Sequence, residues 1–187
     1  MSNNNHSINE FDFNLICEYF SSTERQGPGS EDATLKALQL LETLPVRPRI
    51  ADLGCGTGSS ALLLAKHTQG EIVALDLFPQ FLEKLQSRAE QQGVSKRVTT
   101  VVGSMDSLPF AESSFDAIWS EGAIYNVGFM RGVHEWFRFI KPGGYLAVTD
   151  ASWLTDSRPK EIEELPRIET QDTVKRTIKL PVASERQ

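Results

Sequence analysis

The sequence predicts a doubly wound α/β domain built on a mostly parallel sheet. From residue 49 onward, short apolar runs of strand length alternate with helical segments. This alternation is typical of βαβ units, because parallel neighbouring strands need a long crossover. A glycine-rich stretch at residues 54–58 follows the first apolar run and directly precedes a helical segment. Such a strand-to-helix turn is where open α/β sheets bind ligands.

The composition fits one globular domain. The chain has 187 residues, of which 40% are hydrophobic and 24% are charged, and a domain typically has ~100–200 residues. No apolar run approaches the roughly 18–20 residues that cross a bilayer, so we expect no membrane span. The polar, Asn-rich start lacks a basic stretch followed by an apolar one. We therefore expect no leader peptide and a cytoplasmic protein.

Charge and cysteine content argue against several classes of partner. The 19 Lys and Arg residues against 25 Asp and Glu give a net charge of −6, the wrong sign for a surface that neutralises nucleic-acid phosphates. Cys17 and Cys55 lie far apart, and neither has another Cys or His at metal-ligand spacing. We expect no nucleic-acid or membrane partner, no disulfide framework and no metal site.

Two helices are predicted before the sheet. Apolar residues recur at helical spacing over residues 9–20, which indicates an amphipathic helix. A second helix is predicted to begin after Ser30, which can cap it, and to end before Pro45. Its apolar stripe runs from Leu35 to Leu44.

The predicted strands are five apolar runs, at residues 49–53, 71–77, 98–102, 115–119 and 145–149. The helix between the second and third runs ends at Gly93. The next long helix has its apolar face between Phe129 and Ile140 and breaks at the Lys-Pro-Gly-Gly sequence of residues 141–144. Helices therefore separate most of the strands, as a doubly wound sheet requires.

The tail from residue 157 is rich in charge and poor in apolar residues. It has room for one or two helical turns at residues 161–165 and a strand at residues 177–182. We treat residues 1–187 as one domain, with N-terminal helices at residues 1–45, a ligand-binding core at residues 46–155 and a shortened tail at residues 156–187.

The glycine-rich turn carries the sharpest functional signal. Its sequence, Asp-Leu-Gly-Cys-Gly-Thr-Gly at residues 52–58, lets a ligand approach the backbone closely and is expected to point the free N–H groups of the following helix at it. Ser59 stands where a dinucleotide fingerprint would need its third glycine. The Asp52 carboxylate would repel a diphosphate but can accept hydrogen bonds from an ammonium group. This pattern favours a zwitterionic, amino-acid-like ligand.

Two further strand ends carry suitable polar groups. Asp76 ends the second predicted strand, where a carboxylate can accept both hydroxyls of a ribose. After the third strand, Met105 can lie on an adenine face and Asp106 can accept the adenine amino proton. Three successive strand ends thus offer an ammonium site, a ribose site and an adenine site at one edge of the sheet.

These motifs resemble the class I S-adenosylmethionine-dependent methyltransferases, with a Rossmann-like sheet, and more closely the bacterial small-molecule group. The resemblance covers about residues 10–155 and rests on DLGCGTG, VALD, GSMDSLPF, FDAIWSEGAIYNVGF and IKPGGYLAVTD, in this order. It implies S-adenosyl-L-methionine as the cofactor and methyl transfer to a small-molecule acceptor, which this sequence does not identify.

The resemblance also implies roles for individual residues. Asp52, Gly54 and Gly56 would hold the methionyl part, Asp76 the ribose, and Met105 and Asp106 the adenine. Further cofactor contacts are implied for Gln26, Gly27, Gly29, Cys55, Leu77, Ser104 and Ser120. Glu121 and Tyr125 would lie near the sulfonium and the acceptor, and they are the local candidates for a general base where the acceptor arrives protonated.

Structural interpretations stand beside these functional ones. The glycine turn could be a tight connection only, and the loop at residues 26–29 an ordinary loop that leads into a helix. Glu121 could cap the following turn, Tyr125 could be a rim aromatic, and Cys55 could be a small packing residue. A nicotinamide-dependent reductase is the alternative enzyme, although the missing third glycine weakens it.

The chain after Asp150 is short compared with the family, whose sheet normally has seven strands with an antiparallel hairpin after the fifth. A truncated or frameshifted reading frame would explain this, and so would a compact variant that uses a partner chain. An open edge beside the fifth strand would favour association into a homodimer. A cofactor-binding but catalytically incomplete partner protein is the alternative to an active methyltransferase.

Overall fold

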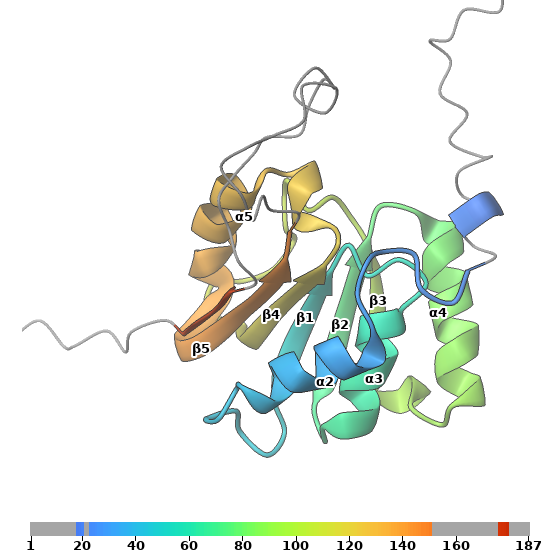
Figure 1. Cartoon of the computed structure of the whole chain (residues 1–187), viewed down its shortest axis with the longest axis horizontal. Coiled ribbons are helices and arrows are strands. Elements are labelled where there is room, and N and C mark those ends of the chain that lie inside the picture. Colours follow the sequence, from blue (N-terminus) through green and yellow to red (C-terminus); the bar gives the residue numbers. More distant parts are fainter. Residues whose placement is uncertain (1–17, 21–22, 151–175, 180–187) are drawn as a thin grey trace, which may run out of the picture.

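The computed structural model describes residues 18–20, 23–150 and 176–179. Its centre is a six-stranded sheet with the strand order β3-β2-β1-β4-β5-β6 (Figure 1). The first five strands pair in parallel and β6 pairs antiparallel with β5. The strands are β1 (Arg49–Leu53), β2 (Glu71–Asp76), β3 (Val98–Val102), β4 (Phe115–Glu121), β5 (Ile140–Thr149) and β6 (Arg176–Lys179).

Helices cover both faces of the sheet, as the doubly wound prediction requires. The α-helices are α2 (Glu31–Gln39), α3 (Ser59–His67), α4 (Pro79–Gln91) and α5 (Phe129–Trp136), and the 3-10 helices are η1 (Ser95–Arg97), η2 (Ile124–Asn126) and η3 (Phe137–Phe139). One core cluster joins the sheet to α3 and α4, with Leu38 of α2 at its margin, and the other joins it to η2, α5 and η3. In β1, Ile50 belongs to the first cluster and Ala51 to the second, because successive strand residues point to opposite faces.

Several predicted boundaries are confirmed and others are wrong. β1 and β3 begin and end where the sequence predicts, and β4 continues two residues beyond Trp119 to Glu121. β5 begins at Ile140, so the Lys-Pro-Gly-Gly sequence lies inside the strand. The pairing of β4 with β5 absorbs it through a register shift, in which Phe115 pairs with Ile140 and Ala117 with Tyr145, since such an irregularity accommodates extra residues in one strand.

Helix α2 is shorter than predicted. It begins after Ser30, whose hydroxyl accepts a hydrogen bond from the Ala33 N–H, but it ends at Gln39. The Thr43 N–H then donates to the Tyr145 hydroxyl at 3.1 Å. This contact holds the chain on β5 in a non-helical path before Pro45 is reached.

Gly58 fixes the packing between the glycine turn and α4. Its φ of +90° is a conformation that other residues rarely adopt, and a Cβ there would lie 2.1 Å from Leu85 Cδ1. Only glycine allows α3 to begin here with α4 packed against it.

The end of the chain adds one strand. β6 overlaps the predicted strand at residues 177–182 and pairs with β5 from Tyr145 to Val148. β5 is therefore not an open edge over this stretch, contrary to the expectation. The predicted helical turns at residues 161–165 and most of the predicted helix at residues 9–20 lie outside the described residues, although residues 18–20 are helical. Within the described chain no helix is long and apolar enough to span a bilayer.

Candidate functional site

A cavity of about 380 Å³ lies at the carboxyl ends of β1, β2 and β4. We call it the cofactor pocket. Much of the predicted site lines it, namely Gln26, Gly27, Asp52, Gly54, Cys55, Gly56, Asp76, Glu121 and Tyr125. Phe20, Arg25, Thr57, Ser59, Ser60, Phe78, Phe81, Gly122 and Asn126 complete the lining. The parallel strands explain this gathering, because their carboxyl ends meet at one edge of the sheet.

Asp52 is a buried carboxylate at the floor of the cofactor pocket. It is 1% exposed, and its Oδ2 atom has no hydrogen-bond partner in the protein. Burial raises the pKa of Asp52 to about 8, with the nearby Glu121 and Asp76 carboxylates adding to the rise and the Ala61 N–H and Arg25 opposing it. A buried polar atom without a partner is costly, so this oxygen is suited to a ligand that donates a hydrogen bond.

Asp76 lies beside Asp52 at the end of β2. Its Oδ2 accepts from the Gly56 N–H at 2.8 Å and its Oδ1 from the Phe78 N–H at 3.0 Å. Burial raises the pKa of Asp76, and these backbone donors oppose the rise. The two hydrogen bonds fix the carboxylate, and each oxygen keeps a lone pair for a ligand hydroxyl.

The N–H groups within the glycine turn, at residues 54–58, donate hydrogen bonds inside the protein. Gly54 and Cys55 both donate to the Leu75 carbonyl, and Gly58 donates to the Cys55 carbonyl. The Gly56 N–H is taken by Asp76, and the Thr57 N–H donates to Gln26 Oε1 at 3.1 Å. A diphosphate needs several free donors, so this turn is poorly suited to a dinucleotide.

The segment at residues 23–29 crosses over the glycine turn. The Gln26 side chain accepts from Thr57 and also donates to the Phe20 carbonyl. At Gly56, where φ is +53°, an added Cβ would lie 1.8 Å from Gln26 Oε1. The Glu24 carbonyl accepts from the Ser59 hydroxyl and from Arg88. Glycine at position 56 therefore allows this segment to cover the turn.

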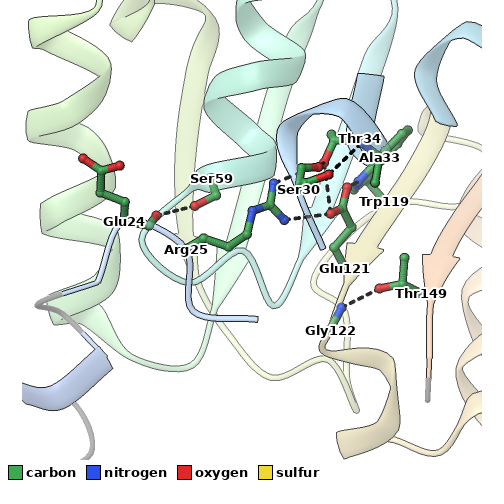
Figure 2. A network of polar contacts seen from close by, with 10 residues as sticks. All are labelled: Glu24, Arg25, Ser30, Ala33, Thr34, Ser59, Trp119, Glu121, Gly122 and Thr149. Carbon is green, nitrogen blue, oxygen red and sulfur yellow. Dashed lines mark hydrogen bonds and ion pairs between the residues drawn. The ribbon is translucent and has the colours of Figure 1, made fainter. Parts of the chain in front are cut away.

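Glu121 is held by three donors from two parts of the chain (Figure 2). Its Oε2 accepts from Arg25 and from the Thr34 hydroxyl, both at 3.0 Å, and its Oε1 accepts from Trp119 Nε1 at 2.8 Å. The Glu121 side chain is only 8% exposed. The ion pair ties the segment at residues 23–29 to the end of β4.

The network includes Thr34, which is not among the predicted site residues. Thr34 is buried on α2, where it accepts from Arg25 as well as donating to Glu121. The signal was present, because Thr34 shares the helical spacing of Leu38 and Leu41 on the buried face. A polar residue on an apolar stripe needs a buried partner.

Four of the predicted cofactor contacts lie outside the lining of the cofactor pocket, namely Leu77, Ser104, Met105 and Asp106. Met105 and Asp106 are the two predicted for adenine. Asp106 forms an exposed ion pair with Arg131 at 2.7 Å and accepts from the Ser104 hydroxyl at 3.3 Å. Met105 is close to the glycine turn, since a Cβ at Gly54 would lie 3.0 Å from its sulfur.

Ser120 and Gly29 also stand apart from the cofactor pocket. Ser120 is fully buried and donates to the Leu53 carbonyl at 2.8 Å, so it supports the sheet and is not on the pocket surface. Gly29 lines a second cavity of about 610 Å³ between α2 and the ends of β4 and β5, which shares Glu121, Gly122 and Tyr125 with the cofactor pocket. We call it the second cavity. The described residues contain no cluster of side chains that could hold a metal ion.

Comparison with known proteins agrees with this architecture. Residues 50–144 match the family model described as a methyltransferase domain. YjhP from E. coli superposes with a TM-score of 0.69 at 26% identity, over 80% of this chain and 60% of that one. The [4+2]-cyclase SpnF gives a TM-score of 0.60 at 27% identity, over 72% and 52% of the two chains.

The curated relatives are longer than this chain. The sarcosine/dimethylglycine N-methyltransferase of Aphanothece halophytica is 31% identical over 66% of this chain but only 45% of its own length. The chain spans between 32% and 51% of the three relatives that head the comparison. The family match and the parallel sheet agree with the resemblance in the sequence. The chain belongs to the methyltransferase domain family, within the class I S-adenosylmethionine-dependent methyltransferases.

Proposed function

We propose that this chain binds S-adenosyl-L-methionine in the cofactor pocket and transfers its methyl group to a small-molecule acceptor. The observation that carries the proposal is the buried Asp52 carboxylate, whose Oδ2 atom has no protein partner and which faces a cavity. A ligand ammonium would supply the missing hydrogen-bond donor. Its positive charge would also stabilise the ionised form of Asp52, which burial disfavours. An amino-acid ligand fits this position better than a neutral or anionic one.

The neighbouring groups fit the rest of the cofactor. Asp76 is fixed by two backbone donors beside Asp52, and we assign it to the ribose hydroxyls. Gln26 and Gly27 would cover the methionyl end. Leu77, Ser104, Met105 and Asp106 lie beyond the pocket lining and would contact an adenine that extends past Asp76, with the ion pair to Arg131 aligning Asp106.

The bound cofactor supplies a methyl group on a sulfonium, which is already activated for displacement. The protein then has to align the acceptor and exclude water. Tyr125 lines both cavities and is 62% exposed, so we assign it to acceptor contact. Glu121 is neutralised by Arg25 and accepts two further hydrogen bonds. We therefore assign Glu121 to positioning and not to proton removal.

A cofactor-binding protein without methyl transfer is the second candidate. The chain spans about half or less of its curated relatives, and a structural neighbour, SpnF, is named as a cyclase. Fold alone does not set the chemistry.

We also propose that the chain forms a homodimer, which light scattering would test. We further propose a cytoplasmic location, which the free thiol of Cys55 suits. Cell fractionation would test the location.

Calorimetric titration of the full chain tests the cofactor. We expect one equivalent of S-adenosylmethionine to bind and NAD to give no heat. Asp76→Ala should weaken the affinity at least tenfold, whereas the exposed α2 variant Asp32→Ala should leave it unchanged. Binding of NAD in place of S-adenosylmethionine would overturn the proposal.

Transfer of a labelled methyl group to small-molecule extracts then separates the two candidates. We expect incorporated label with the wild type and none with Asp76→Ala. Cofactor binding without any methyl transfer would favour the catalytically incomplete partner protein.

The variant Glu121→Gln tests the positioning role of Glu121. A loss of turnover that is equal at all pH values supports positioning, and a changed pH profile would identify Glu121 as the general base.

A further inference from the structure

The second cavity, of about 610 Å³, is larger than the cofactor pocket. One wall is α2 and the other is formed by the carboxyl ends of β4 and β5. Its volume lies within the ~300–1,000 Å³ that is typical of small-molecule sites. The cavity is therefore large enough for a whole ligand and is more than a gap between side chains.

The walls of the second cavity are mainly apolar. From α2 come Ala33 and Ala37, and Leu40, the C-cap residue of α2, continues the same face and is 60% exposed. From the strands come Trp119 and Ala147. A helix face of this kind normally packs against protein, but here it borders a cavity. An apolar ligand would be stabilised by burying this surface.

The charged side chains in the lining do not give the second cavity a strong electrostatic field. Lys36 is exposed to solvent, and Asp150 has an interaction partner. Glu121 is neutralised by Arg25 and points its oxygens at Thr34 and Trp119 (Figure 2). A strongly charged ligand would have no compensating cluster in this cavity.

The second cavity adjoins the cofactor pocket. Glu121, Gly122 and Tyr125 line both, and the Gly122 N–H donates to the Thr149 hydroxyl at 2.8 Å, which fixes the boundary between them. Displacement at a methyl group needs the acceptor atom and the donor in contact and in line. A molecule that fills the second cavity can reach this boundary at its Tyr125 end.

We propose that the second cavity takes the methyl acceptor and that this acceptor is an elongated, largely apolar molecule. The proposal rests on the proposed function and names its substrate class. The accepting atom lies at the Glu121–Tyr125 boundary, and the rest of the molecule extends along Ala33, Ala37 and Leu40. This face covers about 10 Å, since α-helical residues rise 1.5 Å each.

A neutral apolar dye, Nile red, tests the cavity directly. We expect the full chain to bind it saturably, with one site and a blue-shifted emission. Leu40→Asp should weaken binding at least tenfold. The matched control Val46→Asp changes another exposed apolar residue, which is 77% exposed and lies outside this cavity, and should stay within twofold of the wild type. Equal dye binding by the two variants, or no saturable binding, would overturn the proposal.

A second pair of variants tests the volume of the cavity instead of its polarity. Ala37→Phe should also weaken dye binding at least tenfold, whereas Gln39→Phe, on the same helix but outside the cavity, should not. Calorimetry with S-adenosylmethionine checks that all four variants keep the cofactor affinity of the wild type. A loss of cofactor binding in Leu40→Asp would show that the two sites are not separate, and would overturn the assignment of Leu40 to the acceptor.

Labelled methyl transfer identifies the acceptor class. With cell extract as the source of acceptors, we expect the label to pass into an organic solvent on extraction and to fall at least tenfold with Leu40→Asp but not with Val46→Asp. Label confined to the aqueous phase would overturn the apolar acceptor while supporting methyl transfer. Absence of S-adenosylmethionine binding would instead overturn the proposed function, and saturable dye binding that is lost in Leu40→Asp would then still support an apolar ligand site.

Discussion

The Glu121 carboxylate shows how one residue joins the two cavities. Arg25, Thr34 and Trp119 all donate to it, and they lie in the segment at residues 23–29, in α2 and in β4. A buried carboxylate without these donors would carry a large desolvation cost. The network therefore links the N-terminal segment, α2 and β4 at the point where cofactor and acceptor would meet.

Removal of Arg25 should destabilise the fold, because it leaves a buried negative charge without its counter-ion. We expect Arg25→Met to lower the free energy of unfolding by about 3 kcal/mol, as for other broken buried ion pairs. The double variant Arg25→Met with Glu121→Gln should be more stable than Arg25→Met alone. Urea unfolding of the four proteins in this double-mutant cycle measures the coupling, and additive losses would contradict a direct interaction.

Asp52 should make the stability of the ligand-free protein depend on pH. Its pKa is raised from 3.8 to about 8 in the fold, so between these pH values the folded state keeps a proton that the unfolded state has lost. The free energy of unfolding therefore falls as pH rises through this range. Asp52→Asn removes the effect, and its stability relative to the wild type should increase by a few kcal/mol from pH 4 to pH 8.

Chemical denaturation at several pH values measures this difference. A difference in the free energy of unfolding between Asp52→Asn and the wild type that stays constant with pH would contradict the raised pKa of Asp52.

Binding of S-adenosylmethionine below pH 8 should release a proton, since the ammonium group of the ligand favours the ionised Asp52 carboxylate. Calorimetry in buffers of different ionisation enthalpy detects that proton.

Some site residues could be predicted from the sequence because they follow strands. Asp52 is the last residue but one of β1 and Asp76 ends β2, and both line the cofactor pocket, since parallel strands bring such residues to one edge. Ser120 also lies near a strand end, but its side chain faces the interior and donates to Leu53. The partners of Glu121 could not be predicted, because contacts between distant residues such as Arg25 depend on tertiary packing.

At the scale of elements, local patterns predicted the bounds of β1 and β3 but not the end of α2 or the start of β5. β1 and β3 are apolar runs bounded by polar or turn residues, and their bounds match the prediction. The end of α2 was wrong because the Thr43 contact to Tyr145 takes the chain out of the helix. Tertiary contacts of this kind override local propensity. The sequence signal for the start of α2 was correct, because a cap depends only on neighbouring residues.

The Ser30 cap gives a local test of α2. Its hydroxyl accepts from the Ala33 N–H at 3.2 Å, and N-cap serines contribute about 1 kcal/mol. Ser30→Ala should lower the free energy of unfolding by that amount, while Ser30→Asp should keep it, because aspartate also caps and its charge favours a helix N-terminus. Thermal and urea unfolding measure the change, and equal losses in both variants would exclude capping as the cause.

At the scale of the whole molecule, the sheet determines where the ligand-binding side chains lie, and its edge strands need to be covered by other parts of the chain. Five parallel strands bring the ligand-binding side chains to one edge, while helices bury the two faces (Figure 1). β6 pairs antiparallel with β5 over Tyr145 to Val148. An uncovered strand edge presents unpaired N–H and C=O groups and promotes association. β6 thus protects the strand that forms one wall of the second cavity.

Proline substitutions in β6 test this protection. In an antiparallel pair, successive residues alternate between directing their N–H to the partner strand and away from it. Thr177 pairs with Ala147 and Ile178 with Leu146, so one of Thr177→Pro and Ile178→Pro should remove a hydrogen bond to β5, and the other should leave the ladder intact. We expect the disruptive variant to show an increased mass in size-exclusion chromatography with light scattering. Thr177→Val and Ile178→Val keep the N–H and should match the wild type, whereas unchanged masses for both proline variants would show that β6 does not limit association through β5.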